Sequence, residues 1–302
     1  MTITAAGDYG AGQAAVDVLS LIGEIEATAH LALGDLSYGE VTESEWCALA
    51  AEHAGSVERW HLVAGNHETL DNPDASLAAL AECLPGSART TGDYPRQYFL
   101  DLPATEPLVR LIQVSPGLTF PDGTWTYRAG GPRDRWLDQA VRQARADGIA
   151  WVVVSAHLPC QSLGVHSCPA SRDFYDRVVA AGVDLVLHGH EHAYARTHQL
   201  QHATPDCQRL PVDGFAESCI ADRDDEYAAG AGTVFTTSGT GGAVLRPVAT
   251  ADAEEGFFAA ASGWRRAASH GVLRLDVTDE SLAAAFIPVG GGPGEDRFVV
   301  TR

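Results

Sequence analysis

The side chains best suited to chemistry in this 302-residue chain lie in five short motifs, each with a typical metal ligand beside small or strand-forming residues. In chain order the motifs are Gly7-Asp8-Tyr9-Gly10, Gly34-Asp35-Leu36-Ser37-Tyr38, Gly65-Asn66-His67-Glu68, Val154-Ser155-Ala156-His157 and Gly189-His190-Glu191-His192. As a ligand set they offer two carboxylates, one phenol, one amide oxygen and three imidazoles, enough to hold two metal ions side by side. Two neighbouring ions are a general device for hydrolysing phosphate esters.

Each motif alone is weak evidence, and its position along the chain matters more. A Gly-Asp pair after a strand is usually a turn in which the aspartate bonds its own backbone. All five motifs, however, follow segments whose pattern predicts a strand, namely residues 2–6, 30–33, 61–64, 151–155 and 183–187. Because ligands gather beyond the strand ends of α/β sheets, we expect the five loops to meet at one pocket.

The elements that must position these loops alternate between helices and strands. Apolar spacing predicts helices at 12–28, 42–53, 74–84, 134–147 and 172–181, with cap residues for the third between Asp71 and Asp74. Further strands are predicted at 97–102, 109–114, 234–237, 272–277 and 282–287, and residues 200–232 as an irregular acidic excursion. This order predicts an α/β fold, with two mixed β-sheets packed as a sandwich flanked by helices. We expect one catalytic domain spanning residues 1–302.

In order and type, the motifs resemble those of the calcineurin-like metallophosphoesterases, and within them the purple acid phosphatases. The resemblance extends from Asp8 to about Ile287 and includes the run at 189–194. Most members of the larger family have a histidine two residues after the first aspartate, where this chain has Gly10. Purple acid phosphatases instead have a tyrosine three residues after the second aspartate, and Tyr38 stands at that position. The resemblance implies the four-layer metallophosphoesterase fold, in the short form that lacks the separate β-domain of the large plant members.

The resemblance also implies a role for each ligand-type side chain. Asp8, Tyr38 and His192 would bind the first metal. Asn66, His157 and His190 would bind the second, and Asp35 would bridge both. The donor chemistry agrees, since anionic oxygens with one imidazole favour a hard ion such as Fe(III) in the first site. The carboxylate, amide and two imidazoles of the second site suit a divalent ion, and Zn, Fe and Mn all remain open.

The reaction implied is hydrolysis of phosphate monoesters by a metal-activated hydroxide, without a covalent phospho-enzyme. His67 lies beside a metal ligand, and His166 follows His157 by nine residues, at about the spacing where the family has a histidine near the substrate. We predict that His67 and His166 bind phosphate or protonate the leaving oxygen; an exposed loop histidine is the alternative for His166. Glu68 is predicted to orient an imidazole.

Two other functions are compatible with the same residues. A phosphodiesterase or nucleotidase would use the same metals and differ in the pocket walls, which the sequence does not expose. A metal-binding protein devoted to recognition or iron redox chemistry, with incidental hydrolysis, is the alternative from another class. The intact ligand set and the two predicted proton donors argue against the latter.

Charge and hydropathy narrow the range of partners. The net charge is −20 and all 20 basic residues are arginine, so the surface repels phosphate backbones and no nucleic-acid partner is predicted. A small phosphorylated substrate is the predicted partner, because bound cations reverse the field locally. No apolar run approaches the ~18 residues of a membrane helix, so no membrane partner is predicted. The sequence leaves the oligomeric state open.

The six cysteines bear on the compartment. Cys160 and Cys168 flank one short loop, and Cys207 and Cys219 flank another. Local disulfides and six buried thiols fit the sequence equally well. Disulfides would indicate an oxidising compartment, and on that basis we predict an exported protein, with the cytoplasm as the alternative. No signal peptide is recognisable in the sequence.

Overall fold

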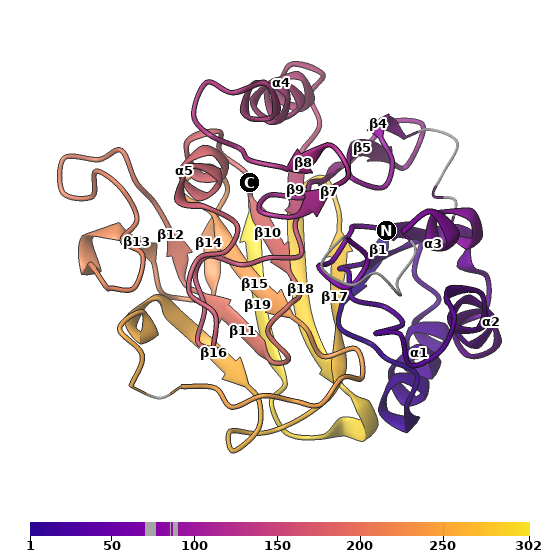
Figure 1. Cartoon of the computed structure of the whole chain (residues 1–302). Coiled ribbons are helices and arrows are strands. Elements are labelled where there is room, and N and C mark those ends of the chain that lie inside the picture. Colours follow the sequence, from indigo (N-terminus) through magenta and orange to yellow (C-terminus); the bar gives the residue numbers. More distant parts are fainter. Residues whose placement is uncertain (70–76, 85, 87–89, 250) are drawn as a thin grey trace.

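Two large mixed β-sheets pack face to face in the computed structural model, which describes residues 1–69, 77–84, 86, 90–249 and 251–302 (Figure 1). The seven-stranded sheet has the order β14 (Glu226–Ala228), β19 (Asp296–Thr301), β18 (Ser281–Pro288), β17 (Gly271–Val277), β1 (Thr2–Ala6), β2 (Ala29–Ala32) and β3 (Trp60–Leu62). The eight-stranded sheet has the order β16 (Phe258–Ser262), β11 (Tyr194–Thr197), β15 (Val234–Ser238), β10 (Leu185–His188), β9 (Trp151–Ser155), β6 (Val109–Gln113), β5 (Gln97–Leu102) and β4 (Thr91–Asp93). Two small sheets pair β7 (Thr119–Phe120) with β8 (Gly123–Thr124) and β12 (Gln199–Leu200) with β13 (Ile220–Asp222).

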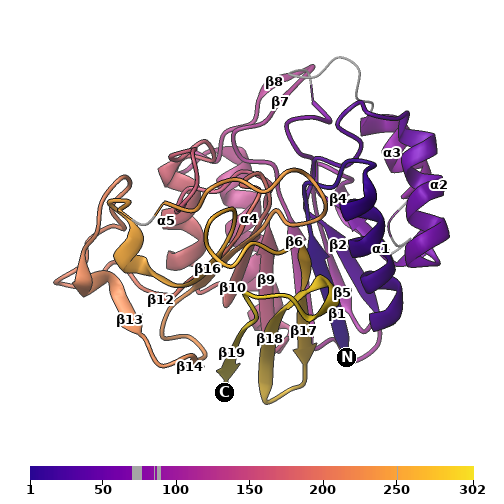
Figure 2. The same ribbon diagram turned by 90° about the horizontal axis from the view of Figure 1, so that it is seen from below.

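Helices cover the outer faces of both sheets (Figure 2). The helices α1 (Gln13–Ile25), α2 (Glu43–Ala54) and α3 (Leu77–Cys83) share one apolar cluster with β1 to β3, and α4 (Pro132–Ala146) and α5 (Arg172–Ala180) share another with β9 and β10. Short 3-10 helices occur at Val57–Arg59, Glu217–Cys219, Glu255–Phe257 and Val289–Gly291. The predicted fold class, two mixed sheets flanked by helices, is therefore confirmed.

The central strands have continuous apolar sequences because both of their faces are buried in the core. In β9, Trp151 and Val153 contribute to the cluster between the two sheets, whereas Val152 and Val154 pack toward the helices. A strand buried on both faces has no polar side, so its sequence does not alternate. The cluster between the sheets also includes Ile3 of β1 and Leu273 of β17, which ties the two sheets together.

The strand topology gathers the five motif loops at one edge. The strands β1, β2 and β3 run parallel to one another, as do β6, β9, β10 and β15. Parallel strands end at the same edge of a sheet, so the loops after β1, β2 and β3 are neighbours, as are those after β9 and β10. A hydrogen bond from the Gly7 N–H to the Ser238 carbonyl (2.9 Å) joins these edges of the two sheets.

Several elements differ from those predicted. The sequence did not predict β11, β16 or β19, and the excursion at 200–232 also contains β13 and the edge strand β14. The third predicted helix is observed as α3, while its predicted caps at Asp71 to Asp74 lie outside the described residues. Within the part of the chain that the structure describes, every helix is too short or too polar to cross a bilayer.

Three disulfides link the six cysteines. Two of them, Cys160–Cys168 and Cys207–Cys219, close the short loops considered from the sequence. The third, Cys47–Cys83, joins α2 to α3 across 36 residues. Spacing could not reveal this pair, because only the packing of α2 against α3 brings the two cysteines together.

Candidate metal centre

Four of the seven predicted ligands adopt a left-handed backbone conformation. The φ angles are 63° for Asp8, 55° for Asp35, 54° for Tyr38 and 69° for His190. Residues other than glycine rarely adopt such angles. Strained backbone of this kind persists where surrounding contacts hold it, and it clusters at functional sites. The loops after β1, β2 and β10 thus bend sharply at the residues whose side chains were predicted to meet.

A first group of donors forms where the loops after β1, β2 and β10 converge. The Tyr38 hydroxyl lies 2.9 Å from Oδ1 of Asp8 and 3.0 Å from Nε2 of His192. Nε2 of His192 is 3.5 Å from the same Asp8 oxygen. Three donor atoms from three separate loops therefore stand within 3.5 Å of one another.

A second group of donors lies beside the first. Nε2 of His157 is 3.2 Å from Oδ2 of Asp35 and 3.1 Å from Oδ1 of Asn66. Asp35, His157 and His190 each offer a ligand atom within 4.8 Å of the others. The two groups are joined at His190, whose backbone N–H donates to Oδ2 of Asp8 at 2.7 Å. All seven side chains predicted as metal ligands are thus in one place.

The imidazoles are oriented by backbone carbonyls. Nδ1 of His157 lies 2.7 Å from the carbonyl of Leu33, and Nδ1 of His192 lies 2.9 Å from that of Val244. A carbonyl only accepts, so the proton must be on Nδ1 in both rings. In His192, which is neutral, this leaves the Nε2 lone pair directed at the donor groups, as a metal ligand requires. Burial would lower the pKa of His157 as well, but the charge and hydrogen bond of Asp35, with Asp8 and the Leu33 carbonyl, together raise it to about 10. Nε2 of His157 therefore carries a proton toward Asp35 that a bound cation would replace.

Glu68 holds the loop that carries Asp35. Its carboxylate accepts N–H groups from Asp35 (2.8 Å), Leu36 (2.6 Å) and Gly65 (2.8 Å). The sequence predicted an imidazole as the partner of Glu68, and backbone amides take that place because the sharp turn after β2 leaves them unpaired. Gly65 packs so closely here that a Cβ at this position would lie 2.1 Å from Oδ1 of Asp35.

Three acidic side chains of the site have shifted pKa values. Burial raises the pKa of Asp8 to about 7, with His157 opposing the rise and Asp35 adding to it. Burial would also raise the pKa of Asp35, but the charge and hydrogen bond of His157, together with His67, outweigh burial and lower the pKa to about 2. Burial, together with both carboxylates, holds the pKa of the Tyr38 hydroxyl well above its ordinary value. Buried carboxylates are paired or bind metals, so this donor set fits cations.

The other imidazoles are in their ligand form. Burial, with the nearby charge of His157, lowers the pKa of His190 to about 2. Burial, with the charge of Arg246, lowers the pKa of His192 to about 4. Both rings are therefore neutral at ordinary pH, and neutral imidazole is the form that binds metal ions.

The two predicted catalytic histidines pack against different predicted ligands. The His67 ring packs on Tyr38 with centroids 4.4 Å apart, and its Nε2 is 3.9 Å from Oδ2 of Asp35. The His166 ring packs on His190 with centroids 4.2 Å apart. His166 is therefore half-buried beside the donors, and its role in binding phosphate or protonating the leaving oxygen stays a prediction.

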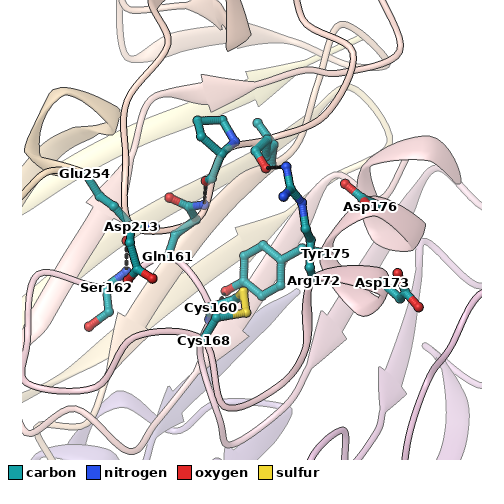
Figure 3. The surroundings of a disulfide bond; sticks show 12 residues. Cys160, Gln161, Ser162, Cys168, Arg172, Asp173, Tyr175, Asp176, Asp213 and Glu254 are labelled. Atoms are coloured by element: carbon teal, nitrogen blue, oxygen red, sulfur yellow. Dashed lines mark hydrogen bonds between the residues drawn. A yellow bond between two sulfur atoms is a disulfide. The ribbon is translucent and has the colours of Figure 1, made fainter.

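The His166 loop is held by two carboxylates and a disulfide. The backbone N–H of His166 donates to Glu191 at 2.7 Å, and the Ser162 hydroxyl donates to the same oxygen at 3.1 Å. Glu254 accepts the backbone N–H groups of Ser162 and Asp213, both at 2.9 Å. Figure 3 shows Glu254 with Ser162 and Asp213, near the Cys160–Cys168 disulfide that closes the loop. The loop is thus connected both to the ligand motif at 189–192 and to the excursion at 200–232.

Sequence reasoning missed one residue near the donors, Arg246. One of its guanidinium nitrogens is 3.0 Å from Nε2 of His166. A guanidinium can only donate, so Nε2 of His166 accepts and the proton of that ring is on Nδ1. The arginine follows the glycine-rich turn at 239–242, and no motif pointed to it.

Tyr194 and Arg196, which follow the last motif, serve packing rather than the site. The Tyr194 hydroxyl donates to Asp296 at 2.7 Å, and Arg196 forms an ion pair with the same carboxylate at 2.6 Å. Both side chains are fully buried. They join β11 to β19, away from the donor groups.

Comparisons with known proteins agree on the family. The family described as calcineurin-like phosphoesterases matches residues 1–194. An uncharacterized protein of Mycobacterium tuberculosis is 28% identical over 242 residues, covering 75% of this chain and 44% of that protein. Purple acid phosphatase 18 of Arabidopsis thaliana is 24% identical over 213 residues, covering 68% of this chain and 47% of that protein. The chain thus spans about half the length of these curated relatives.

Solved structures share the fold. Purple acid phosphatase PPD1 from yellow lupin (Lupinus luteus) seeds superposes with a TM-score of 0.73 at 15% identity, covering 100% of this chain and 54% of that one. GAP50, the anchor in the inner membrane complex of Plasmodium, has a TM-score of 0.61 at 14% identity, with 100% and 89% covered. A dimetal phosphatase from Danio rerio has a TM-score of 0.52 at 13% identity, with 100% and 98% covered. At these identities the likeness concerns the fold alone.

Proposed function

The chain belongs to the calcineurin-like phosphoesterase family of hydrolases, and we propose that it hydrolyses phosphate monoesters at a two-metal centre of the purple acid phosphatase type. The observation that carries this proposal is the convergence of a tyrosine with the carboxylates and imidazoles expected of such a centre. The Tyr38 hydroxyl, 2.9 Å from Asp8 and 3.0 Å from His192, supports a first site with a phenol ligand.

The proposed ligands follow from the two donor groups. Asp8, Tyr38 and His192 would hold the first ion, and Asn66, His157 and His190 would hold the second, with Asp35 available to both. A phenolate and two carboxylates favour Fe(III) in the first site, and the more neutral second set favours Zn, Fe or Mn as a divalent ion. When bound, such a pair of cations polarises the phosphoryl oxygens and lowers the pKa of a bound water.

Two histidine side chains of the chain are proposed to position the substrate and to donate protons or hydrogen bonds to it. We assign to His67 the protonation of the leaving oxygen, because its ring is one-third exposed at the edge of the donor groups. The His166 ring packs against His190 and carries its proton on Nδ1. We assign to that N–H a hydrogen bond to a phosphoryl oxygen of the substrate. General acid catalysis by a placed histidine contributes typically about 10²–10⁴-fold to rate.

The test is hydrolysis of aryl phosphates by the purified protein loaded with Fe(III) and a divalent ion. We expect the aryl monoester to be cleaved faster than the diester, and Asp35→Asn to abolish cleavage of both. Exposed Asp279→Asn is the matched control and should behave as the wild type. Preference for the diester would favour the phosphodiesterase or nucleotidase alternative. No cleavage of either ester by protein with two bound metals would favour a metal-binding protein with another task.

The three disulfides support an oxidising compartment as the place of this activity. Three disulfides in one chain are expected in oxidising surroundings rather than in the cytoplasm. We therefore propose an exported hydrolase acting on small phosphorylated substrates as a single catalytic domain. Mass spectrometry of the natural protein without reductant should find the three pairs, and six free thiols would refute the export proposal.

A further inference from the structure

Arg246 is fixed beside the metal centre by its backbone. Its N–H donates to the carbonyl of His192 at 2.9 Å, and its own carbonyl accepts the N–H of Trp264 at 2.9 Å. One of these partners is a proposed metal ligand and the other begins the turn after β16. The base of the arginine side chain therefore has a definite position relative to the donor groups, although it lies in a loop.

The guanidinium of Arg246 contacts only neutral acceptors among the residues that the structure describes. One nitrogen is 3.0 Å from Nε2 of His166 and 3.5 Å from the carbonyl of His190. Other arginines pair with carboxylates, as Arg177 does with Asp134 at 2.6 Å. Within the described part of the chain, no carboxylate oxygen lies within 4.0 Å of Arg246. Its charge is thus not neutralised by a partner.

An unneutralised arginine matters in a chain with a net charge of −20. Such a protein repels a phosphate dianion over most of its surface. Arg246 lies beside the donor groups, with its backbone hydrogen-bonded to His192 and its guanidinium 3.5 Å from the carbonyl of His190. A planar guanidinium donates two parallel N–H groups and so matches the oxygens of a phosphoryl group better than an ammonium does.

We propose that Arg246 is a substrate-binding residue that donates hydrogen bonds to the phosphoryl oxygens of the ester. This inference rests on the proposed phosphatase function and adds to it a residue for recognition. His166 and the His190 carbonyl hold the guanidinium in place in the absence of substrate. A phosphoryl oxygen, being anionic, is a stronger acceptor than either of them.

The experiment compares Arg246→Ala and Arg246→Lys with the wild type in the metal-loaded protein. Arg265→Ala is the matched control, because this substitution changes the net charge by the same amount. Arg265 is exposed, and its guanidinium stacks on Trp264. Three quantities are measured for each protein: metal content, the dissociation constant of inorganic phosphate by calorimetry, and kcat and KM for an aryl phosphate. Free guanidinium is then added to Arg246→Ala to test for chemical rescue.

We expect Arg246→Ala to keep both metals and to bind phosphate roughly 10- to 100-fold more weakly, the loss typical of a hydrogen bond to a charged group. KM should rise by a similar factor, Arg246→Lys should lose less, and guanidinium should restore part of the loss. Unchanged phosphate affinity in Arg246→Ala, or an equal loss in Arg265→Ala, would overturn the proposal. Cleavage of the ester by the wild type is measured separately from phosphate binding. If the wild type binds phosphate through Arg246 but cleaves no ester, the proposed phosphatase function is rejected, while the role of Arg246 in phosphate binding is supported.

Discussion

The hydroxyl of Tyr38 lies 3.0 Å from Nε2 of His192, although 154 residues separate the two in the chain. The contact depends on the left-handed turn at Tyr38 after β2 and on the carbonyl of Val244, which orients the His192 ring. The turn belongs to the motif that ends at Tyr38, whereas Val244 lies in a segment outside both motifs. The short distance between the Tyr38 hydroxyl and His192 is what a metal site with a phenol ligand requires.

Replacement of Tyr38 by phenylalanine should remove the colour of the iron-loaded protein. A phenolate bound to Fe(III) produces a charge-transfer band in the visible range, and phenylalanine offers no oxygen. We expect the band in the wild type and its loss in Tyr38→Phe, measured by absorption spectroscopy with the iron content determined in parallel. Tyr227→Phe is the control, since Tyr227 is a buried tyrosine bonded to Arg196. A band that persists in Tyr38→Phe would assign another chromophore.

Replacement of Gly65 by alanine should weaken metal binding. The added Cβ would lie 2.1 Å from Oδ1 of Asp35 and 2.4 Å from its backbone nitrogen, so the Asp35 carboxylate must move. Displacing a group that supports metal ligands typically costs 10- to 100-fold in affinity, and we expect a loss in this range by metal titration. Gly12→Ala, which meets nothing within 4 Å, should bind metal as the wild type does. Equal affinities in all three proteins would show that Asp35 is not a ligand.

The stability of the protein should depend on pH through Glu254. Burial raises the pKa of Glu254 to about 7, against the two backbone N–H groups that favour its ionised form. The folded pKa exceeds the ordinary value of 4.5, so the stability that Glu254 contributes is full below pH 4.5 and is lost as pH rises through about 7. Urea unfolding at pH about 5 and about 8 should show a smaller drop for Glu254→Gln than for the wild type. Identical drops would exclude the effect.

Removing the Cys160–Cys168 disulfide should impair activity as well as stability. Opening an eight-residue loop costs about 2.5 kcal/mol in the chain-entropy account. The loop carries His166, so the double serine variant should also lose turnover. The matched control is the double serine variant of Cys207 and Cys219, whose loop of 12 residues carries no proposed catalytic group. Thermal unfolding and kcat/KM for an aryl phosphate separate the two effects, and equal activity in both variants would remove His166 from the mechanism.

The elements and the ligand types could be predicted from local pattern. Strands such as β9 are buried on both faces, so their apolar runs are plain in the sequence, and the motif residues follow directly at their ends. The strands that were missed, β11 and β16 among them, carry polar or small residues whose burial depends on their partners. The residues Tyr194 and Arg196 are an example, because Asp296 on a distant strand makes their burial possible.

The sequence by itself determined which side chains were available for metals and that each of their loops follows a strand, because both are properties of neighbouring residues. Tertiary structure alone decided how those side chains are held and what stands beside them. Glu68 binds the backbone of Asp35, 33 residues away, and Arg246 meets His166 across 80 residues. The Cys47–Cys83 disulfide depends on the packing of two helices. Such contacts arise from the way sheets and helices pack in space, and no local pattern of residue types encodes them.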